Sequence, residues 1–239
     1  MDKKLVLFDL DGTLLPQDQE KFIAAYFGAL VGKLAGLGLP AGTPEEQKAL
    51  AAAVWRGTLA MMQNDGSKTN EERFFEVFGA SVGVDILPLK PEFDNFYENE
   101  FQTVGAVCGK NPLVRVAIDR LKEKGMRIAI ATNPLFPLVA NKHRVRWAGL
   151  DIGEFEFCTC YENSRFCKPS LEYYRGILDR LGVSAQDCLM VGNDVREDMV
   201  ARELGMDVFL ITDCLINPEN RDINDYPHGS WQDFIDLVG

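Results

Sequence analysis

Two aspartates spaced two residues apart follow a short apolar run near the start of the chain. The segment Leu5–Leu15 is LVLFDLDGTLL, so Asp9 and Asp11 come after four apolar residues and before a glycine and a threonine. Side chains alternate along a strand, so the two carboxylates share a face if the extended conformation persists through them. Two carboxylates this close repel each other unless a cation or a proton intervenes. Mg²⁺, which prefers oxygen ligands, would resolve that conflict.

The elements around these aspartates indicate a parallel sheet. Continuous apolar runs, typical of strands buried on both faces, occur at Leu5–Phe8, Ile128–Ala131, Cys188–Val191 and Val208–Ile211, with a weaker run at Phe155–Thr159. Segments of helical length that stop before a glycine are Leu113–Lys124, Leu138–Ala148, Leu171–Leu181 and Glu197–Leu204. This alternation predicts an α/β fold with a doubly wound parallel sheet, in which ligands bind at the carboxyl ends of the strands.

The chain between the first two runs predicts a separate helical module. Thr43 with Glu46 and Thr69 with Glu72 each form a capping-box pattern at a helix start. Two further helical segments, Gln17–Leu37 and Pro91–Thr103, give four helices, which is enough for a small bundle. We therefore expect a helical domain of residues 16–105 inserted into a core domain of residues 1–15 and 106–239.

Four sets of residues in this chain resemble, in order, the motifs of the haloacid dehalogenase (HAD) superfamily of phosphotransferases. The first is the DxDGT sequence that begins at Asp9, and the second is Thr132 with Asn133 after an apolar run. The third is Lys168 with Pro169. The fourth, usually written GDxxxxD, corresponds to Gly192, Asn193, Asp194 and Asp198. The resemblance extends over nearly the whole chain, although only these motifs are specific.

The resemblance implies a role for each of these positions. Asp9 would attack phosphorus and form an aspartyl phosphate. Asp11 would protonate the leaving oxygen and then deprotonate the attacking water. Thr132 and the backbone amide of Asn133 would bind nonbridging phosphate oxygens. Lys168 would place a positive charge against the nucleophile and the phosphoryl group.

The resemblance also implies a Mg²⁺ cofactor held by Asp9, the backbone carbonyl of Asp11 and an acidic residue of the fourth motif. This sequence departs from the family there, because Asn193 occupies the usual aspartate position and the acid comes one residue later. We favour Asp194 as the ligand, supported by Asp198 through water or Lys168. In the alternative, Asn193 supplies a neutral oxygen and holds the metal more weakly.

The length of the insert indicates the helical-cap (type C1) subgroup of the family. Asp9 and Thr132 are 123 residues apart, whereas Thr132 and Lys168 are 36 apart, so only the first gap can hold a domain. A cap that roofs the site favours small phosphomonoesters over protein phosphates. A sugar phosphate, a nucleotide monophosphate and a glycolate-type phosphate all fit this expectation. We interpret the cap's cations as solvated helix charges and its aromatic residues as bundle core: Arg56, Lys68, Arg73; Phe74, Phe75, Phe78, Phe93, Phe96 and Phe101.

Charge and composition exclude several classes of partner. With 25 basic and 36 acidic side chains the net charge is −11, which disfavours nonspecific binding to nucleic acid or to membrane surfaces. The longest uncharged apolar stretch, Phe22–Gly32, is about half a membrane span. Six cysteines without a dense even spacing predict reduced thiols. We expect a cytoplasmic enzyme, monomeric or homodimeric, that acts on a small-molecule phosphate ester without nucleic-acid or membrane partners.

The predicted function is Mg²⁺-dependent hydrolysis of a small-molecule phosphomonoester through an aspartyl phosphate. Two alternatives stay open from the sequence, a phosphomutase on the same scaffold and a noncatalytic binding protein with this fold. The dehalogenase branch of the family needs no metal, and the second carboxylate with the metal-site acids argues against it.

Overall fold

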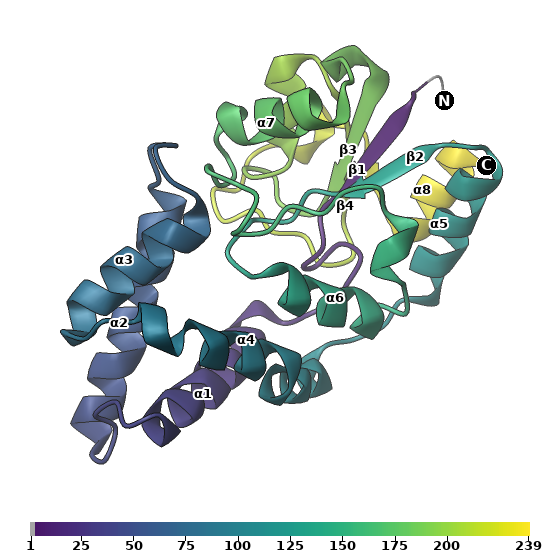
Figure 1. The fold of residues 1–239 in the computed structure, drawn as a ribbon. Coiled ribbons are helices and arrows are strands. Elements are labelled where there is room, and N and C mark those ends of the chain that lie inside the picture. Colours follow the sequence, from purple (N-terminus) through teal and green to yellow (C-terminus); the bar gives the residue numbers. More distant parts are fainter. Residues whose placement is uncertain (1–2) are drawn as a thin grey trace.

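The computed structural model describes residues 3–239, in which a parallel five-stranded sheet runs in the order β2-β1-β3-β4-β5 (Figure 1). The strands are β1 (Leu5–Phe8), β2 (Arg127–Ile130), β3 (Cys188–Gly192), β4 (Asp207–Ile211) and β5 (His228–Gly229). Every residue of β1 and β3 is buried, as the continuous apolar runs predict. The predicted α/β class and the doubly wound sheet are confirmed, with β1 between β2 and β3.

Helices cover both faces of this sheet. Alternate residues of β1 point to opposite faces, so Val6 and Phe8 pack in one apolar cluster and Leu5 and Leu7 in another. The first cluster is covered by α5 (Pro112–Glu123), α6 (Leu138–Trp147) and α8 (Trp231–Val238), and the second by α7 (Leu171–Leu181) and the 3₁₀ helix η5 (Met199–Leu204). Other short 3₁₀ segments are Leu87–Leu89, Ile152–Glu154, Ala185–Asp187 and Ile223–Asp225.

Four α-helices form a group beside the carboxyl ends of the strands (Figure 1). They are α1 (Gln19–Gly36), α2 (Pro44–Met62), α3 (Asn70–Val82) and α4 (Lys90–Glu98), followed by the 3₁₀ helix η2 (Glu100–Val107). Both predicted capping boxes are present, at Thr43 and Thr69. The predicted aromatic core is confirmed, because all six phenylalanines are buried in one cluster. That cluster also takes in Ala140, Tyr161 and Cys167, so it is continuous with the sheet-bearing part of the chain.

Three sequence-based elements differ from the structure. The run Phe155–Thr159 is not a strand, because it makes one isolated bridge to β2 at Cys158 before turning away. The fourth predicted helix is interrupted at Asn99, whose backbone angles (φ −114°, ψ −77°) end α4. The segment predicted as a helix from Glu197 is a turn followed by η5, since the Asp198 side chain is engaged by Lys168 and the Asp194 amide.

Besides this apolar packing, hydrogen bonds tie the helical group to the rest of the molecule at two places. The two linkers run side by side, and the Gly109 amide donates to the Pro16 carbonyl at 2.7 Å. At the start of α3, the buried Asn70 side chain donates to the Pro134 carbonyl at 3.1 Å and to the Cys167 sulfur at 3.3 Å. The loop that precedes Lys168 is therefore fastened to the helical group. Within residues 3–239, no helix has both the length and the apolarity that a membrane crossing requires.

Candidate active site

Three neighbouring strands bring the motif residues to one edge of the sheet. Asp9 directly follows β1, Thr132 and Asn133 follow β2, and Asn193 and Asp194 follow β3. The Asp9 amide continues the ladder by donating to the Val191 carbonyl at 2.9 Å, which fixes the backbone at the nucleophile position. Because parallel strands end at the same edge, side chains far apart in the sequence converge there.

Asp9 and Lys168 form a buried ion pair at the bottom of the site. The Lys168 ammonium is fully buried and donates to Asp9 Oδ1 at 2.8 Å and to Asp198 Oδ1 at 2.6 Å. The other oxygen of Asp9 accepts the Thr13 hydroxyl at 3.0 Å. Burial works against the charge on Lys168, but the carboxylates of Asp198 and Asp9 outweigh it and raise the pKa of Lys168 well above its usual value. The lysine therefore stays protonated.

Asp198 is held on both of its oxygens. Besides the contact with Lys168, its Oδ2 accepts the backbone amide of Asp194 at 3.0 Å. Burial raises the pKa of Asp198 to about 7, while the Lys168 ammonium acts in the opposite direction. A Cβ atom on Gly192 would lie 2.1 Å from Asp198 Oδ2, so glycine is required for the carboxylate to reach this position.

The two candidates for the metal ligand in the fourth motif have different surroundings. Asn193 is buried, its oxygen accepts the Thr13 hydroxyl at 2.9 Å, and its nitrogen donates to the Cys214 carbonyl at 2.6 Å. It also packs against Gly12, where a Cβ atom would lie 2.3 Å from the amide nitrogen. Asp194 Oδ1 accepts the amides of residues 196 and 197, both at 2.8 Å. Within residues 3–239, Asp194 Oδ2 accepts no protein hydrogen bond.

The sequence did not single out Arg144, which contacts Asp11. Arg144 lies on α6, is fully buried, and forms an ion pair with the Asp11 carboxylate. It also donates to Thr132 Oγ1 at 3.5 Å and to Asn141 Oδ1 at 2.7 Å, and its guanidinium lies 4.8 Å from the centre of the Phe136 ring. Burial lowers the pKa of Arg144 to about 10, which still leaves it charged at neutral pH.

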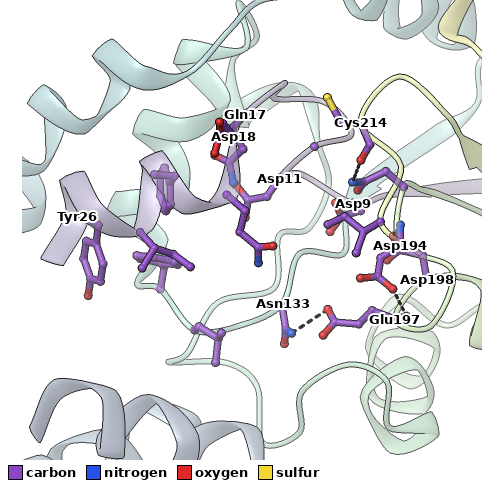
Figure 2. Close-up of a pocket in the computed structure, with 18 of the residues that line it drawn as sticks. Asp9, Asp11, Gln17, Asp18, Tyr26, Asn133, Asp194, Glu197, Asp198 and Cys214 are labelled. Carbon is purple, nitrogen blue, oxygen red and sulfur yellow. Dashed lines mark hydrogen bonds between the residues drawn. The ribbon is translucent and has the colours of Figure 1, made fainter. Parts of the chain in front are cut away.

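Glu197 is a second residue that the sequence analysis missed. Its carboxylate accepts Asn133 Nδ2 at 3.0 Å, so it joins the ends of β2 and β3 (Figure 2). Burial raises the pKa of Glu197 to about 7, opposed by Lys168 and reinforced by Asp194 and Asp198. The Asn133 side-chain oxygen is buried without a hydrogen-bond partner among the described residues.

A cavity of about 620 Å³ opens over these side chains (Figure 2). Of the sequence-predicted residues, those that line it are Asp9, Asp11, Asn133, Asn193, Asp194 and Asp198. Thr132 and Lys168 lie behind this lining, in contact with Arg144 and Asp9 respectively. The structure thus brings all the predicted site residues together around one cavity. Its far wall comes from α1 and α2, which contribute apolar side chains.

The donor chemistry suits a hard divalent cation. Carboxylates of Asp9, Asp11 and Asp194 line the same cavity, and oxygen donors are what Mg²⁺ prefers. Among residues 3–239, no three acidic, histidine or cysteine side chains already enclose a metal-sized position. A site made of two carboxylates and one backbone carbonyl is compatible with that finding.

Arg144 has no sequence signature, whereas the other site residues lie within or beside the motifs. Arg144 is 133 residues from Asp11 in the chain, and its helix shows ordinary basic residues in its last turn. Glu197 does occur between Asp194 and Asp198 in the fourth motif. Its position beside two acids after a predicted strand was the one feature of the sequence that could have identified Glu197 as a site residue.

Comparison with known proteins agrees with this geometry. A family model described as haloacid dehalogenase-like hydrolase matches residues 3–205. A phosphoglycolate phosphatase from Agrobacterium fabrum is 25% identical over 203 residues, covering 83% of this chain and 76% of the relative. Two solved structures share the fold over nearly their whole length.

The first is a HAD phosphatase from Thermococcus onnurineus, with a TM-score of 0.64 and 19% identity over 99% of this chain and 98% of that one. The second is a 2-haloacid dehalogenase from Pseudomonas syringae pv. tomato DC3000, with a TM-score of 0.64 and 22% identity over 99% and 97%. At these identities the two structures establish the fold alone. The family model spans most of the chain, and the chain therefore belongs to the haloacid dehalogenase-like hydrolases.

Proposed function

We propose that this hydrolase is a Mg²⁺-dependent phosphatase that cleaves a small-molecule phosphomonoester through an aspartyl phosphate on Asp9. The observation that carries the proposal is the Asp9 carboxylate, which is held by Lys168 and Thr13 and opens onto the cavity. The two contacts fix its orientation, and a fixed carboxylate is a better nucleophile toward a bound phosphoryl group than a mobile one. The similarity to a phosphoglycolate phosphatase supports a phosphatase.

Backbone amides and Lys168 supply the positive potential that this acidic cavity needs for an anionic ester. The amides of Leu10, Asp11 and Asn133 donate to no protein acceptor within residues 3–239. They lie at the ends of β1 and β2, where nonbridging phosphate oxygens would accept from them. The Thr132 hydroxyl is positioned by Arg144 and belongs to the same phosphate-binding set. These donors stabilise the charge that spreads over the phosphoryl oxygens in the transition state.

Asp11 is the proton-transfer group of the proposed mechanism. It lines the cavity two residues after Asp9, and its ion pair with Arg144 holds it toward α6. In the first step a protonated Asp11 gives its proton to the leaving oxygen. That transfer leaves the carboxylate in the form that accepts a proton from water in the second step, so one group serves both displacements.

Mg²⁺ would be held by Asp9, the carbonyl of Asp11 and Asp194, and when bound it would offset the negative charge between the acids and the phosphate. Asp194 is favoured over Asn193 because its Oδ2 accepts no protein hydrogen bond among the described residues, while both polar atoms of Asn193 are engaged. Asp198 supports Lys168 and the Asp194 amide from behind.

We also propose that residues 16–105 act as a helical cap on a core of residues 1–15 and 106–239. Helices α1 and α2 form one wall of the cavity and the motif residues form the other, which is the arrangement expected of a cap over an active site. Residues 1 and 2 lie outside the described part of the chain. A roofed cavity suits small esters rather than nucleic acid or protein phosphates, and six free cysteines suit a reducing, cytoplasmic environment.

Hydrolysis of p-nitrophenyl phosphate by the Asp9→Asn variant tests the proposal. The variant keeps the size of the side chain and the Thr13 contact, so the protein should remain folded while Mg²⁺-dependent turnover falls by roughly 10³-fold or more. Asp179→Asn, on the exposed side of α7, is the matched control and should retain activity. Chelation of divalent ions should stop wild-type turnover. Retained turnover in Asp9→Asn would remove the nucleophile assignment.

A further inference from the structure

The wall of the cavity formed by the helical group is apolar. The motif residues line one side. The opposite side consists mainly of side chains from α1 and α2, of which Gln19 and Thr58 are polar and the rest are large and apolar: Phe22, Ile23, Tyr26, Phe27, Trp55 and Met62. In Figure 2, Tyr26 on α1 lies across the cavity from Asn133 and Glu197. A phosphoryl group placed at Asp9 would therefore point its leaving group toward this apolar wall.

Several of these side chains are exposed although they are large and hydrophobic. Ile23 is 39% exposed, Trp55 45% and Met62 42%, and Leu215, on the motif side of the cavity, is 37% exposed. All four line this one cavity. Scattered exposed apolar residues are ordinary in soluble proteins, but a group of them in one concave site indicates a surface that an apolar ligand covers.

The cavity offers no cation to a second anionic group. Among its lining residues in the described chain none is lysine, arginine or histidine, and Asp18 adds a carboxylate at the start of α1. Three of the helical group's cations already have partners. Arg56 donates to Ser81, Lys68 pairs with Glu76 at 3.0 Å, and Lys21 pairs with Asp18 at 3.0 Å on the exposed side. A carboxylate or second phosphate on the leaving group would lose hydration here without gaining a cationic partner.

We propose that the substrate is a phosphomonoester whose leaving alcohol carries an uncharged apolar group, aliphatic or aromatic, and no second anionic group. This inference rests on the proposed phosphatase function and specifies its substrate class. The cavity volume of about 620 Å³ supports it, because that is the size of pockets that enclose drug-sized ligands. A two-carbon leaving group such as glycolate would fill a small part of it and would leave its carboxylate without a cation among the lining residues.

A series of n-alkyl phosphates tests the inference, since every member releases a primary alcohol of similar acidity. From ethyl to hexyl phosphate, kcat/KM should rise by roughly twofold to fourfold per methylene, or roughly 16-fold to 250-fold over the four added methylenes, because each methylene leaves water for the apolar wall. 2-Phosphoglycolate should be a poorer substrate than propyl phosphate of similar length. The glycolate hydroxyl is the more acidic leaving group, so chemistry alone would favour the opposite order.

The outcomes separate this inference from the function on which it rests. A flat alkyl series, or a preference for 2-phosphoglycolate, together with Mg²⁺-dependent turnover of p-nitrophenyl phosphate, would overturn the substrate class and leave the phosphatase standing. No phosphate release from any of these esters would overturn both.

Variants of the exposed apolar residues test whether the apolar wall causes the dependence of kcat/KM on alkyl length. Trp55→Ala should lower the ratio of hexyl to ethyl phosphate kcat/KM by roughly fivefold to tenfold. Val116→Ala, a similarly exposed apolar residue on α5 outside the cavity, should leave that ratio unchanged. Ile23→Lys should lower hexyl phosphate turnover and raise 2-phosphoglycolate turnover, because it adds a cation to the wall. Unchanged ratios in both Trp55→Ala and Ile23→Lys would overturn the inference.

Discussion

Arg144 on α6 forms an ion pair with Asp11 in the loop after β1, and the guanidinium has no exposed surface. The ion pair holds the Asp11 side chain toward Thr132, which Arg144 also contacts. With p-nitrophenyl phosphate the departing nitrophenolate needs no proton, so Asp11 acts chiefly in the second step of the proposed mechanism, the deprotonation of water. The arginine is therefore a positioning residue for the group that transfers protons.

We expect Arg144→Met to slow the hydrolysis of the aspartyl phosphate more than its formation. Steady-state turnover of p-nitrophenyl phosphate should fall by roughly tenfold or more, and a burst of nitrophenol should appear in rapid-mixing experiments. Lys142→Met, on the exposed side of the same helix, is the control and should behave as wild type. An unchanged steady-state rate without a burst would show that Arg144 is only structural.

Lys168 should contribute strongly to the free energy of unfolding, because its ammonium neutralises the carboxylates of both Asp9 and Asp198. Lys168→Met leaves two buried carboxylates without a cation, and we expect the free energy of unfolding to fall by about 3–5 kcal/mol in urea denaturation. Adding Asp198→Asn to that variant removes one of the stranded charges and should recover part of the loss. If the double variant is no more stable than Lys168→Met, charge repulsion is not the cause.

Variants at Asp194 and Asn193 should distinguish a residue that binds the metal from one that stabilises the fold. Asp194→Ala removes a proposed ligand and should raise the Mg²⁺ concentration for half-maximal activity by roughly tenfold or more. Asn193→Ala removes the bonds to Thr13 and Cys214 and should lower the free energy of unfolding by about 1–3 kcal/mol with a smaller effect on the Mg²⁺ requirement. A metal titration of both variants decides the ligand, and the reverse order would move the assignment to Asn193.

Glu154 links α5 to the loop after α6 and should make stability depend on pH. Its hydrogen bond with Arg115 lowers its pKa to about 2 from the ordinary 4.5, with Lys122 contributing further. Because the folded-state pKa is depressed, the stabilisation is complete above pH 4.5 and is lost as the pH falls through about 2. Glu154→Gln should thus be less stable than wild type at pH 7 by about 1 kcal/mol, given partial exposure of both cations. A difference that persists at pH 2 would exclude this linkage.

The strands and the motif residues could be predicted because their signals are local in the sequence. Continuous apolar runs located β1 to β4 closely, since a strand buried on both faces must be apolar throughout. The convergence of Asp9, Asn133 and Asp194 then followed from the rule that parallel strands end at one edge.

What could not be predicted depends on tertiary contacts. Arg144 resembles any helix-ending arginine until α6 packs against the loop after β1. The run Phe155–Thr159 has the composition of a strand but makes one bridge. The two-residue β5 and the helix α8 after it were also missed, although Ser230 and Asp233 form a capping box there. The apolar wall of the cavity could not be predicted from the sequence, because it depends on which faces of α1 and α2 the rest of the protein leaves uncovered.

The hydrogen bonds of Asn70 restrict how the helical group can move. One hydrogen-bonded attachment is the pair of linkers at Pro16 and Gly109, and the other is the start of α3 at Asn70. Between them the helical group also packs against α6, where the ring centres of Phe101 and Trp147 lie 5.3 Å apart. A displacement of the helical group that widens the cavity would have to separate this packing and strain the contact of Asn70 with Cys167, which is next to Lys168. Opening of the cavity would then be coupled to the position of Lys168.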